Sequence, residues 1–123
     1  MKRREVKNGT LSVYDDDKLL FTLSEKISDG VMHILLNGQL SNLVALEFED
    51  EVMAALTVCH RLRLDFSGVN YIASTVLRTL LSVQQLIDNI EDAEMTLTGV
   101  TGEVMETFKD SGFSEILEIE SGQ

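Results

Sequence analysis

The stretch of sequence that decides the fold is Leu64-Asp65-Phe66-Ser67-Gly68-Val69-Asn70-Tyr71-Ile72-Ala73-Ser74-Thr75-Val76-Leu77. It opens within an alternation of apolar and polar residues, 62–66, that is typical of a strand. Residues 67–70 combine serine, glycine and asparagine, which favours a loop. A helical pattern then runs from about Ser74 to Ile90, and its apolar stripe is Leu77, Leu80, Leu81, Ile87 and Ile90. The stretch therefore predicts a strand, a loop and a helix that begins beside two hydroxyls.

Another helix is predicted upstream of this stretch, over 43–59. Its apolar residues recur three or four positions apart, and they are Val44, Phe48, Val52, Leu56 and Cys59. Ser41 or Asn42 can cap its start by accepting a hydrogen bond from a free backbone N–H. The intervening face carries Glu47, Glu49, Asp50 and Glu51, and we expect this face to be solvated.

The remaining elements are short. Before the upstream helix, three apolar runs at 11–14, 19–23 and 31–36 are separated by turn-forming residues, which predicts an antiparallel meander. After the downstream helix we expect a strand at 94–98 and a short helix capped by Thr101 that carries Val104, Met105 and Phe108. Gly112 stands where a left-handed helix stop is expected, and residues 116–119 end the pattern as a short helix or strand.

Strands that alternate with helices in the second half imply parallel pairs joined by helical crossovers. The fold class is therefore α/β: a mixed β-sheet of four to six strands with helices packed mainly on one side. The 123 residues suit one domain, which we place at residues 10–120. Residues 1–9 hold four of the ten bases and are expected to form a flexible N-terminal tail.

Charge and cysteine content narrow the classes of partner. The chain has 21 acids and 10 bases, a net charge of −11, and so acidic a body repels nucleic acid and anionic membrane surfaces. We find neither a signal peptide nor an apolar run of the roughly 20 residues that a membrane helix needs. The single cysteine, Cys59, excludes an intramolecular disulfide. We therefore expect a cytoplasmic protein that binds neither nucleic acid nor membrane.

The residue types that carry catalysis do not gather in this sequence. There is no glycine-rich phosphate loop and no nucleophile elbow. His33 and His60 are far apart and have no cysteine pair, so a zinc site is not indicated. The four helix acids lie at neighbouring positions that point in different directions, so they cannot converge on a metal ion. We expect no enzyme activity, no metal and no cofactor.

The hydroxyls at the start of the downstream helix are the candidate site. A helix N-terminus presents unpaired N–H groups and a partial positive charge, which accommodates a phosphate. Phosphorylation of a hydroxyl there would change which partner the surface accepts. The structural alternative is that Ser74 serves only as the N-cap of the helix.

The order and spacing of these motifs resemble the STAS domain, the domain of bacterial anti-anti-sigma factors (anti-sigma factor antagonists) and of sulfate transporter tails. The resemblance rests on Asp65-Phe66-Ser67-Gly68-Val69 followed by Ser74-Thr75, and it is supported by Asn37-Gly38-Gln39-Leu40, Thr98-Gly99-Val100 and the segment from Phe108 to Phe113. It covers about residues 19–120. It implies a STAS-like mixed sheet with helices on one side and a regulatory protein rather than an enzyme.

The resemblance also implies a partner and a switch. Such proteins bind an anti-sigma factor that is also a serine kinase of the histidine-kinase-like ATPase type; the kinase phosphorylates a hydroxyl at the start of the second helix, and a phosphatase reverses this. The usual segment Asp-Ser-Ser/Thr-Gly reads Ala73-Ser74-Thr75-Val76 here. The phospho-acceptor position falls on Thr75, with Ser74 as its neighbour. The implied partner-binding surface is Asn70, Tyr71, Ala73, Ser74, Thr75, Val76 and Arg78.

Two other functions stay open. One is a constitutive STAS scaffold or oligomerisation module, a homodimer among its forms, which needs no hydroxyl. The other is a small-molecule-binding domain that uses the strand-end surface, where open α/β sheets often hold ligands.

Overall fold

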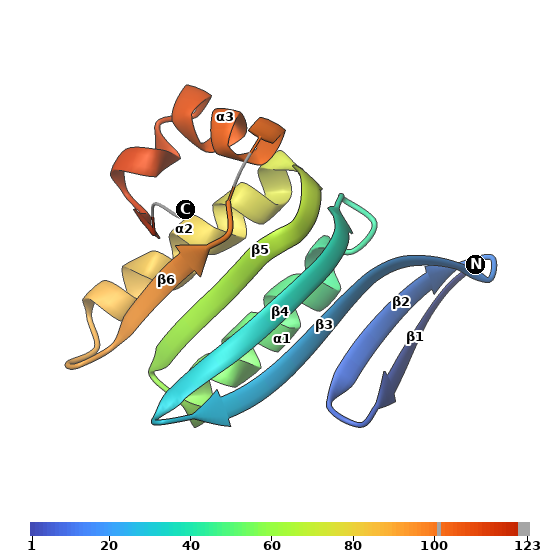
Figure 1. The fold of residues 1–123 in the computed structure, drawn as a ribbon, viewed down its shortest axis with the longest axis horizontal. Coiled ribbons are helices and arrows are strands. Elements are labelled where there is room, and N and C mark those ends of the chain that lie inside the picture. The colour runs from blue at the N-terminus through green and yellow to red at the C-terminus, as the bar shows by residue number, and fades with distance from the viewer. Residues whose placement is uncertain (101, 121–123) are drawn as a thin grey trace.

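A single sheet of seven strands, in the order β1 to β7, organises the molecule (Figure 1). The computed structural model describes residues 1–100 and 102–120. Its strands are β1 (Lys2–Lys7), β2 (Thr10–Asp15), β3 (Lys18–Ser28), β4 (Val31–Leu40), β5 (Arg61–Ile72), β6 (Glu94–Thr98) and β7 (Glu118–Ile119). Its helices are α1 (Ala45–Val58), α2 (Ser74–Asp88) and α3 (Gly102–Asp110), with a 3₁₀ turn η1 (Phe113–Glu115) before β7.

The topology combines an antiparallel and a parallel half, as the order of sequence patterns predicts. β1 to β4 pair antiparallel through short turns, whereas β4 to β7 pair parallel. The crossover helices α1 and α2 lie behind the sheet in Figure 1. The mixed α/β sheet is therefore confirmed, but it has seven strands rather than four to six.

The N-terminal segment is one of the additional strands. Residues 1–9 were expected to be a flexible tail; instead β1 pairs with β2 from Lys2↔Asp15 to Lys7↔Thr10. Its basic side chains reach the acids of α1: Lys2 Nζ lies 3.1 Å from Glu47 Oε2, and Arg4 Nη2 lies 3.3 Å from Glu51 Oε2. The prediction of a fully solvated acidic face is also wrong, since β1 covers part of it and Glu47 is buried.

Strand β5 extends through the residues that were predicted to form a loop. It pairs with β4 as far as Asn37↔Gly68, Gly38↔Val69 and Leu40↔Ile72. A Cβ on Gly68 would lie 1.9 Å from Asn37 Oδ1 and 2.9 Å from Leu36 O. Glycine at this position therefore lets two neighbouring strands approach closely where local turn preferences alone favour a loop.

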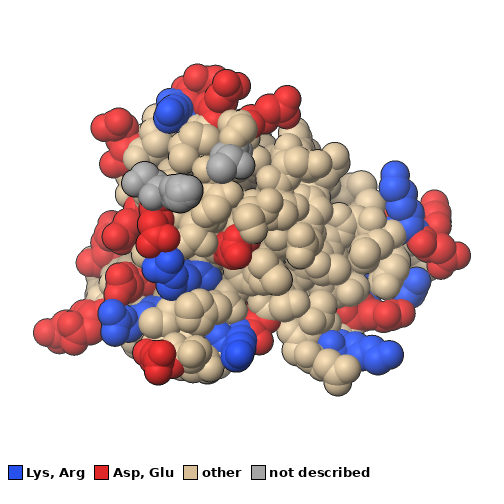
Figure 2. Space-filling view, in the orientation of Figure 1, with Lys and Arg blue, Asp and Glu red and all other residues tan. Residues whose placement is uncertain are grey.

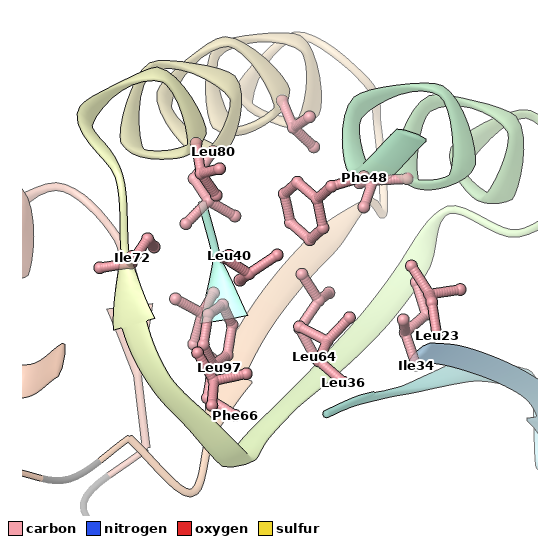
Figure 3. Packing of buried hydrophobic residues seen from close by; sticks show 14 of the residues in the cluster. Leu23, Ile34, Leu36, Leu40, Phe48, Leu64, Phe66, Ile72, Leu80 and Leu97 are labelled. Carbon is pink, nitrogen blue, oxygen red and sulfur yellow. The ribbon is translucent and has the colours of Figure 1, made fainter. Parts of the chain in front are cut away.

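The core lies between the sheet and the two crossover helices (Figure 3). In α1 the predicted residues Val44, Phe48 and Val52 are all fully buried. The predicted capping by Ser41 or Asn42 is wrong: the N-cap residue is Val44, with no side-chain cap, and Ser41 Oγ accepts the N–H of Leu43 instead.

Helix α2 ends at Asp88, two residues before the predicted Ile90. Three residues of its predicted stripe, Leu77, Leu80 and Ile87, are buried; Leu81 and Ile90 are half-buried. The buried face also takes in Val76 and Val83, which the sequence analysis did not assign to it.

The C-terminal elements agree with their predictions wherever the structure describes them. Strand β6 has the expected bounds, and Phe108 of α3 packs edge-on against Phe66 of β5 with ring centroids 6.1 Å apart. Gly112 adopts the predicted left-handed conformation, with φ of 82°. The predicted cap Thr101 lies outside the described residues.

Glu25 of β3 is a carboxylate whose ionised form is disfavoured by the fold. Burial raises the pKa of Glu25, and the nearby Glu51 raises it further; its Oε2 is buried and has no hydrogen-bond partner among the described residues. Because the pKa of Glu25 is higher in the folded than in the unfolded chain, its contribution to the free energy of unfolding is most favourable at a pH below the unfolded pKa. That contribution is lost as the pH rises through the folded pKa.

Replacing Glu25 with glutamine is therefore expected to stabilise the protein at neutral pH. The gain should be clear at about pH 7.5, where Glu25 is ionised in the unfolded chain, and should shrink towards about pH 4. Thermal unfolding of both proteins across this range measures the difference in Tm. A gain of equal size at both ends would contradict an electrostatic origin.

Candidate functional site

The start of α2 is held against the end of β4. Ala73 is the N-cap residue, with extended backbone (φ −84°, ψ 157°), and its N–H donates to Leu40 O at 2.8 Å. No side chain caps this helix. The alternative that Ser74 serves as the N-cap is therefore wrong: Ser74 is the first helical residue, and its side chain is exposed.

The neighbouring hydroxyl of Thr75 is fixed by a residue of the β4–α1 connection. Thr75 Oγ1 donates to Asn42 Oδ1 at 2.7 Å. Thr75 is half-buried, and its backbone carbonyl accepts a hydrogen bond from the Thr79 hydroxyl at 3.3 Å. Sequence reasoning treated Asn42 only as a cap for α1 and missed this role. No local pattern signals a contact between residues 33 positions apart.

The structure divides the predicted partner-binding residues into two groups. Asn70, Tyr71, Ser74 and Arg78 are exposed, and Thr75 lies among them. Ala73 and Val76 are 4% and 0% exposed, so their assignment to the surface is wrong. Both side chains are apolar and lie on the inner side of the start of α2, where they pack into the core.

Two flanking features enlarge the surface around Thr75. Beside Asn42 lies Leu43, which is 51% exposed, and Leu46 in the first turn of α1 is 61% exposed. On the other flank, a groove of about 300 Å³ runs between the end of β5 and α3. It is lined by Asn70, Tyr71, Ile72, Glu103, Val104, Glu106, Thr107 and Asp110. The hydroxyl therefore lies between an apolar and an acidic neighbourhood.

The chemistry available at this site is that of a modifiable hydroxyl at the N-terminus of a 15-residue helix. The first turn of a helix leaves N–H groups without intrahelical partners and carries partial positive charge, so a phosphate on Thr75 would be tolerated by the fold. Within the described residues, no group of three or more His, Cys, Asp or Glu side chains is placed to hold a metal ion.

Comparison with known proteins agrees with this fold. An anti-sigma factor antagonist from Mycobacterium paratuberculosis superposes with a TM-score of 0.75 at 16% identity, over 83% of this chain and 86% of that one. A putative anti-sigma factor antagonist from Thermotoga maritima gives 0.74 at 20% identity, over 81% and 86%. The phosphorylated form of the Bacillus cell fate determinant SpoIIAA gives 0.62 at 12% identity, over 80% and 91%.

No curated protein sequence matches the chain. Among the described residues, no helix has both the length and the apolar character needed to cross a membrane. The model of the STAS domain family matches residues 22–122, which is most of the chain and includes the greater part of β3 and every element from β4 to β7. The order of elements, the pairing of β4 with β5 and the helix that begins at Ser74 all lie within this match, and the chain belongs to the STAS domain family.

Proposed function

We propose that this protein is a regulatory binding module of the anti-anti-sigma type, and that Thr75 is its phosphorylation site. Its partner is an anti-sigma factor with a histidine-kinase-like ATPase fold, which binds the exposed surface at the starts of α1 and α2. The observation that carries the proposal is the hydrogen bond from Thr75 Oγ1 to Asn42 Oδ1 at 2.7 Å, at the N-terminus of α2.

This hydrogen bond prepares the hydroxyl for phosphoryl transfer. Because the Thr75 proton points at Asn42, the oxygen lone pairs are directed elsewhere and can meet the γ-phosphorus of a bound ATP. In the transfer, the Thr75 oxygen gains the phosphoryl group, the hydroxyl proton is released and ADP leaves. Ser74 is more exposed, but no hydrogen bond orients its hydroxyl within the described part of the chain. We therefore assign the acceptor role to Thr75 and not to Ser74.

Phosphorylation would alter the surface that the partner meets. A phosphate adds nearly two negative charges and removes the proton that Thr75 donates to Asn42. The whole chain already carries a net charge of −11, and the groove on one flank of Thr75 is lined by three carboxylates, Glu103, Glu106 and Asp110. A partner that binds the surface with an unmodified Thr75 hydroxyl would therefore bind the phosphorylated surface less favourably. A phosphatase would restore it.

A constitutive STAS scaffold is the second candidate. In the part of the chain that the structure describes, strand β1 pairs with β2 alone and its other side is a sheet edge, and such edges can pair with a second copy. This function would be insensitive to the loss of both hydroxyls. Its signature would be a homodimer in solution that persists in a Ser74→Ala, Thr75→Ala double variant.

Phosphosite mapping tests the proposal. The tagged protein is incubated with ATP and lysate of the source organism, recovered, and analysed by mass spectrometry for bound proteins and for phosphate. We expect a kinase-type anti-sigma factor among the bound proteins and phosphate on Thr75. Thr75→Ala should abolish the modification, Ser74→Ala should leave it in place, and Asn42→Ala should slow it.

Two results would contradict the proposal. An unmodified protein recovered together with such a kinase would remove the switch and favour constitutive binding. Phosphorylation of Ser74 instead of Thr75, or a rate of Thr75 phosphorylation that Asn42→Ala leaves unchanged, would show that the hydrogen bond does not prepare the acceptor.

A further inference from the structure

No helix among residues 1–100 and 102–120 covers the face of the sheet opposite α1 and α2. The strands lie in front of both helices in the orientation of Figure 1, and Figure 2 shows the same side with a broad uncharged area towards the right and basic and acidic side chains gathered towards the left. Its residues are those that alternate with the core: on β4, for example, His33 and Leu35 are exposed between the buried Met32, Ile34 and Leu36. This face is on the opposite side of the sheet from the core and does not include Thr75.

Three basic residues lie in one row across this face. Lys26 of β3 is in register with His33 of β4, and His33 is in register with Arg63 of β5. Side chains in register on neighbouring strands are separated by only about 5 Å at Cβ, so the three nitrogen-bearing side chains lie next to one another. Outside β1 the chain has only six lysines and arginines against 20 acids, and two of the six lie in this row.

Of the three side chains in this row, only Arg63 forms an ion pair with an acid among the described residues. Arg63 Nη2 contacts the carboxylate of Glu120 at 2.9 and 3.1 Å. Neither Lys26 nor His33 forms an ion pair within the described residues. Asp65 lies in the adjoining row, but its Oδ1 accepts the backbone N–H of Ser67 at 2.9 Å. Lys26 and His33 therefore make no direct ion pair, and Asp65 is the one carboxylate of this face among the described residues that line the groove.

A groove of about 610 Å³ runs beside this row, within the range of ligand-sized pockets. It is lined by Ser24, Glu25, Lys26, His33, Ile34, Leu35, Arg63, Asp65 and Thr98. The side chains of Glu25 and Ile34 belong to the opposite, helix-covered face, so those two residues line the groove with their backbone. Leu35 is 43% exposed and provides an apolar patch next to the bases. The groove thus has hydrogen-bond donors of Lys26 and His33 on one side and the apolar side chain of Leu35 beside them.

We infer that this groove binds a small organic anion, a carboxylate or phosphate attached to a short apolar body. The anionic group would accept a charge-assisted hydrogen bond from the Lys26 ammonium and an N–H hydrogen bond from the His33 ring, and the apolar body would cover Leu35. This site is separate from the proposed regulatory surface and does not depend on that function.

Titration of the ¹⁵N-labelled protein with hexanoate, followed by NMR, tests the inference. We expect saturable shifts of amides in residues 24–26, 33–35 and 63–65 with a Kd of about 1 mM, in keeping with so small a ligand. Acetate has the charge without the apolar body, and 1-hexanol has the body without the charge; both should bind at least about tenfold more weakly.

Variants locate the site. Lys26→Glu should weaken hexanoate binding by about tenfold or more, and Leu35→Ser should weaken it by about threefold. The matched control Lys109→Glu makes the same charge change on an exposed residue of α3 and should leave the Kd unchanged. Equal binding of hexanoate and 1-hexanol, shifts confined to other parts of the molecule, or equal effects of the two charge variants would each overturn the inference. So would binding of polyglutamate without binding of hexanoate, because the occupant would then be an acidic protein segment.

Discussion

Replacing Thr75 with glutamate is expected to weaken binding of the kinase-type partner by about a hundredfold, a loss of roughly 3 kcal/mol. The carboxylate removes the hydrogen bond that Thr75 donates to Asn42 and places a charge in an interface that would otherwise bury a neutral hydroxyl. Calorimetry or surface plasmon resonance with the recovered partner measures the change in Kd.

The fold should tolerate this substitution, which separates lost binding from lost structure. An acidic side chain in the first turn of a helix interacts favourably with the helix dipole, and α2 has no acid there now. The Tm of the variant should therefore be equal to or above that of the parent. Tm and partner affinity are expected to move independently.

Two control variants isolate the charge. Thr75→Gln has nearly the same shape as the glutamate variant but is neutral, so it should lose much less affinity. Ser82→Glu adds the same charge on an exposed position of α2 about two turns away and should have little effect. If Thr75→Glu binds the partner as tightly as the parent, Thr75 is not the switch.

Local patterns in the sequence predicted much of the fold. The alternation of 62–66 correctly located the buried face of β5, and the three-to-four spacing of Val44, Phe48 and Val52 located that of α1. These signals are reliable because a strand or helix that buries one face needs apolar residues at every second position in a strand and at every third or fourth position in a helix. The start of α2 at Ser74 was also correct, since the leucine-rich pattern begins there.

The errors concern interactions between distant parts of the chain. Ser67 to Asn70 favour a loop by themselves, but pairing with β4 keeps them in a strand. Lys2 and Arg4 have no apolar pattern, yet they lie in a strand paired with β2 and contact acids of α1 more than 40 positions away. The Asn42–Thr75 hydrogen bond is of the same kind. A single sequence shows which residues are available for such contacts, but not which of them meet.

Replacing Gly38 with alanine is the second change for which we expect a large effect, a loss of stability. Its φ is +113°, a conformation that side chains rarely adopt, and a Cβ there would lie 2.3 Å from the backbone oxygen of Leu20 on β3. Gly38→Ala therefore combines backbone strain with a clash against main chain that cannot rotate away. We expect a loss of about 3–5 kcal/mol in the free energy of unfolding, measured by urea denaturation.

Gly30 offers a control in which only one of these two causes operates. Its φ is +78°, and a Cβ there would meet nothing within 4 Å. Gly30→Ala should therefore cost only the backbone term, about 1–2 kcal/mol. Equal losses in the two variants would contradict the view that the approach of β3 to β4 at Gly38 matters.

The position of Gly38 also connects stability to the proposed switch. It lies two residues before Leu40, whose carbonyl accepts the N–H of Ala73, and four residues before Asn42, which holds the Thr75 hydroxyl. A shift of β4 that relieves the clash would move both of these acceptors. In any Gly38→Ala protein that remains folded, phosphorylation of Thr75 should therefore be slower than in the Gly30→Ala protein, because only the former disturbs the strand that positions the acceptor.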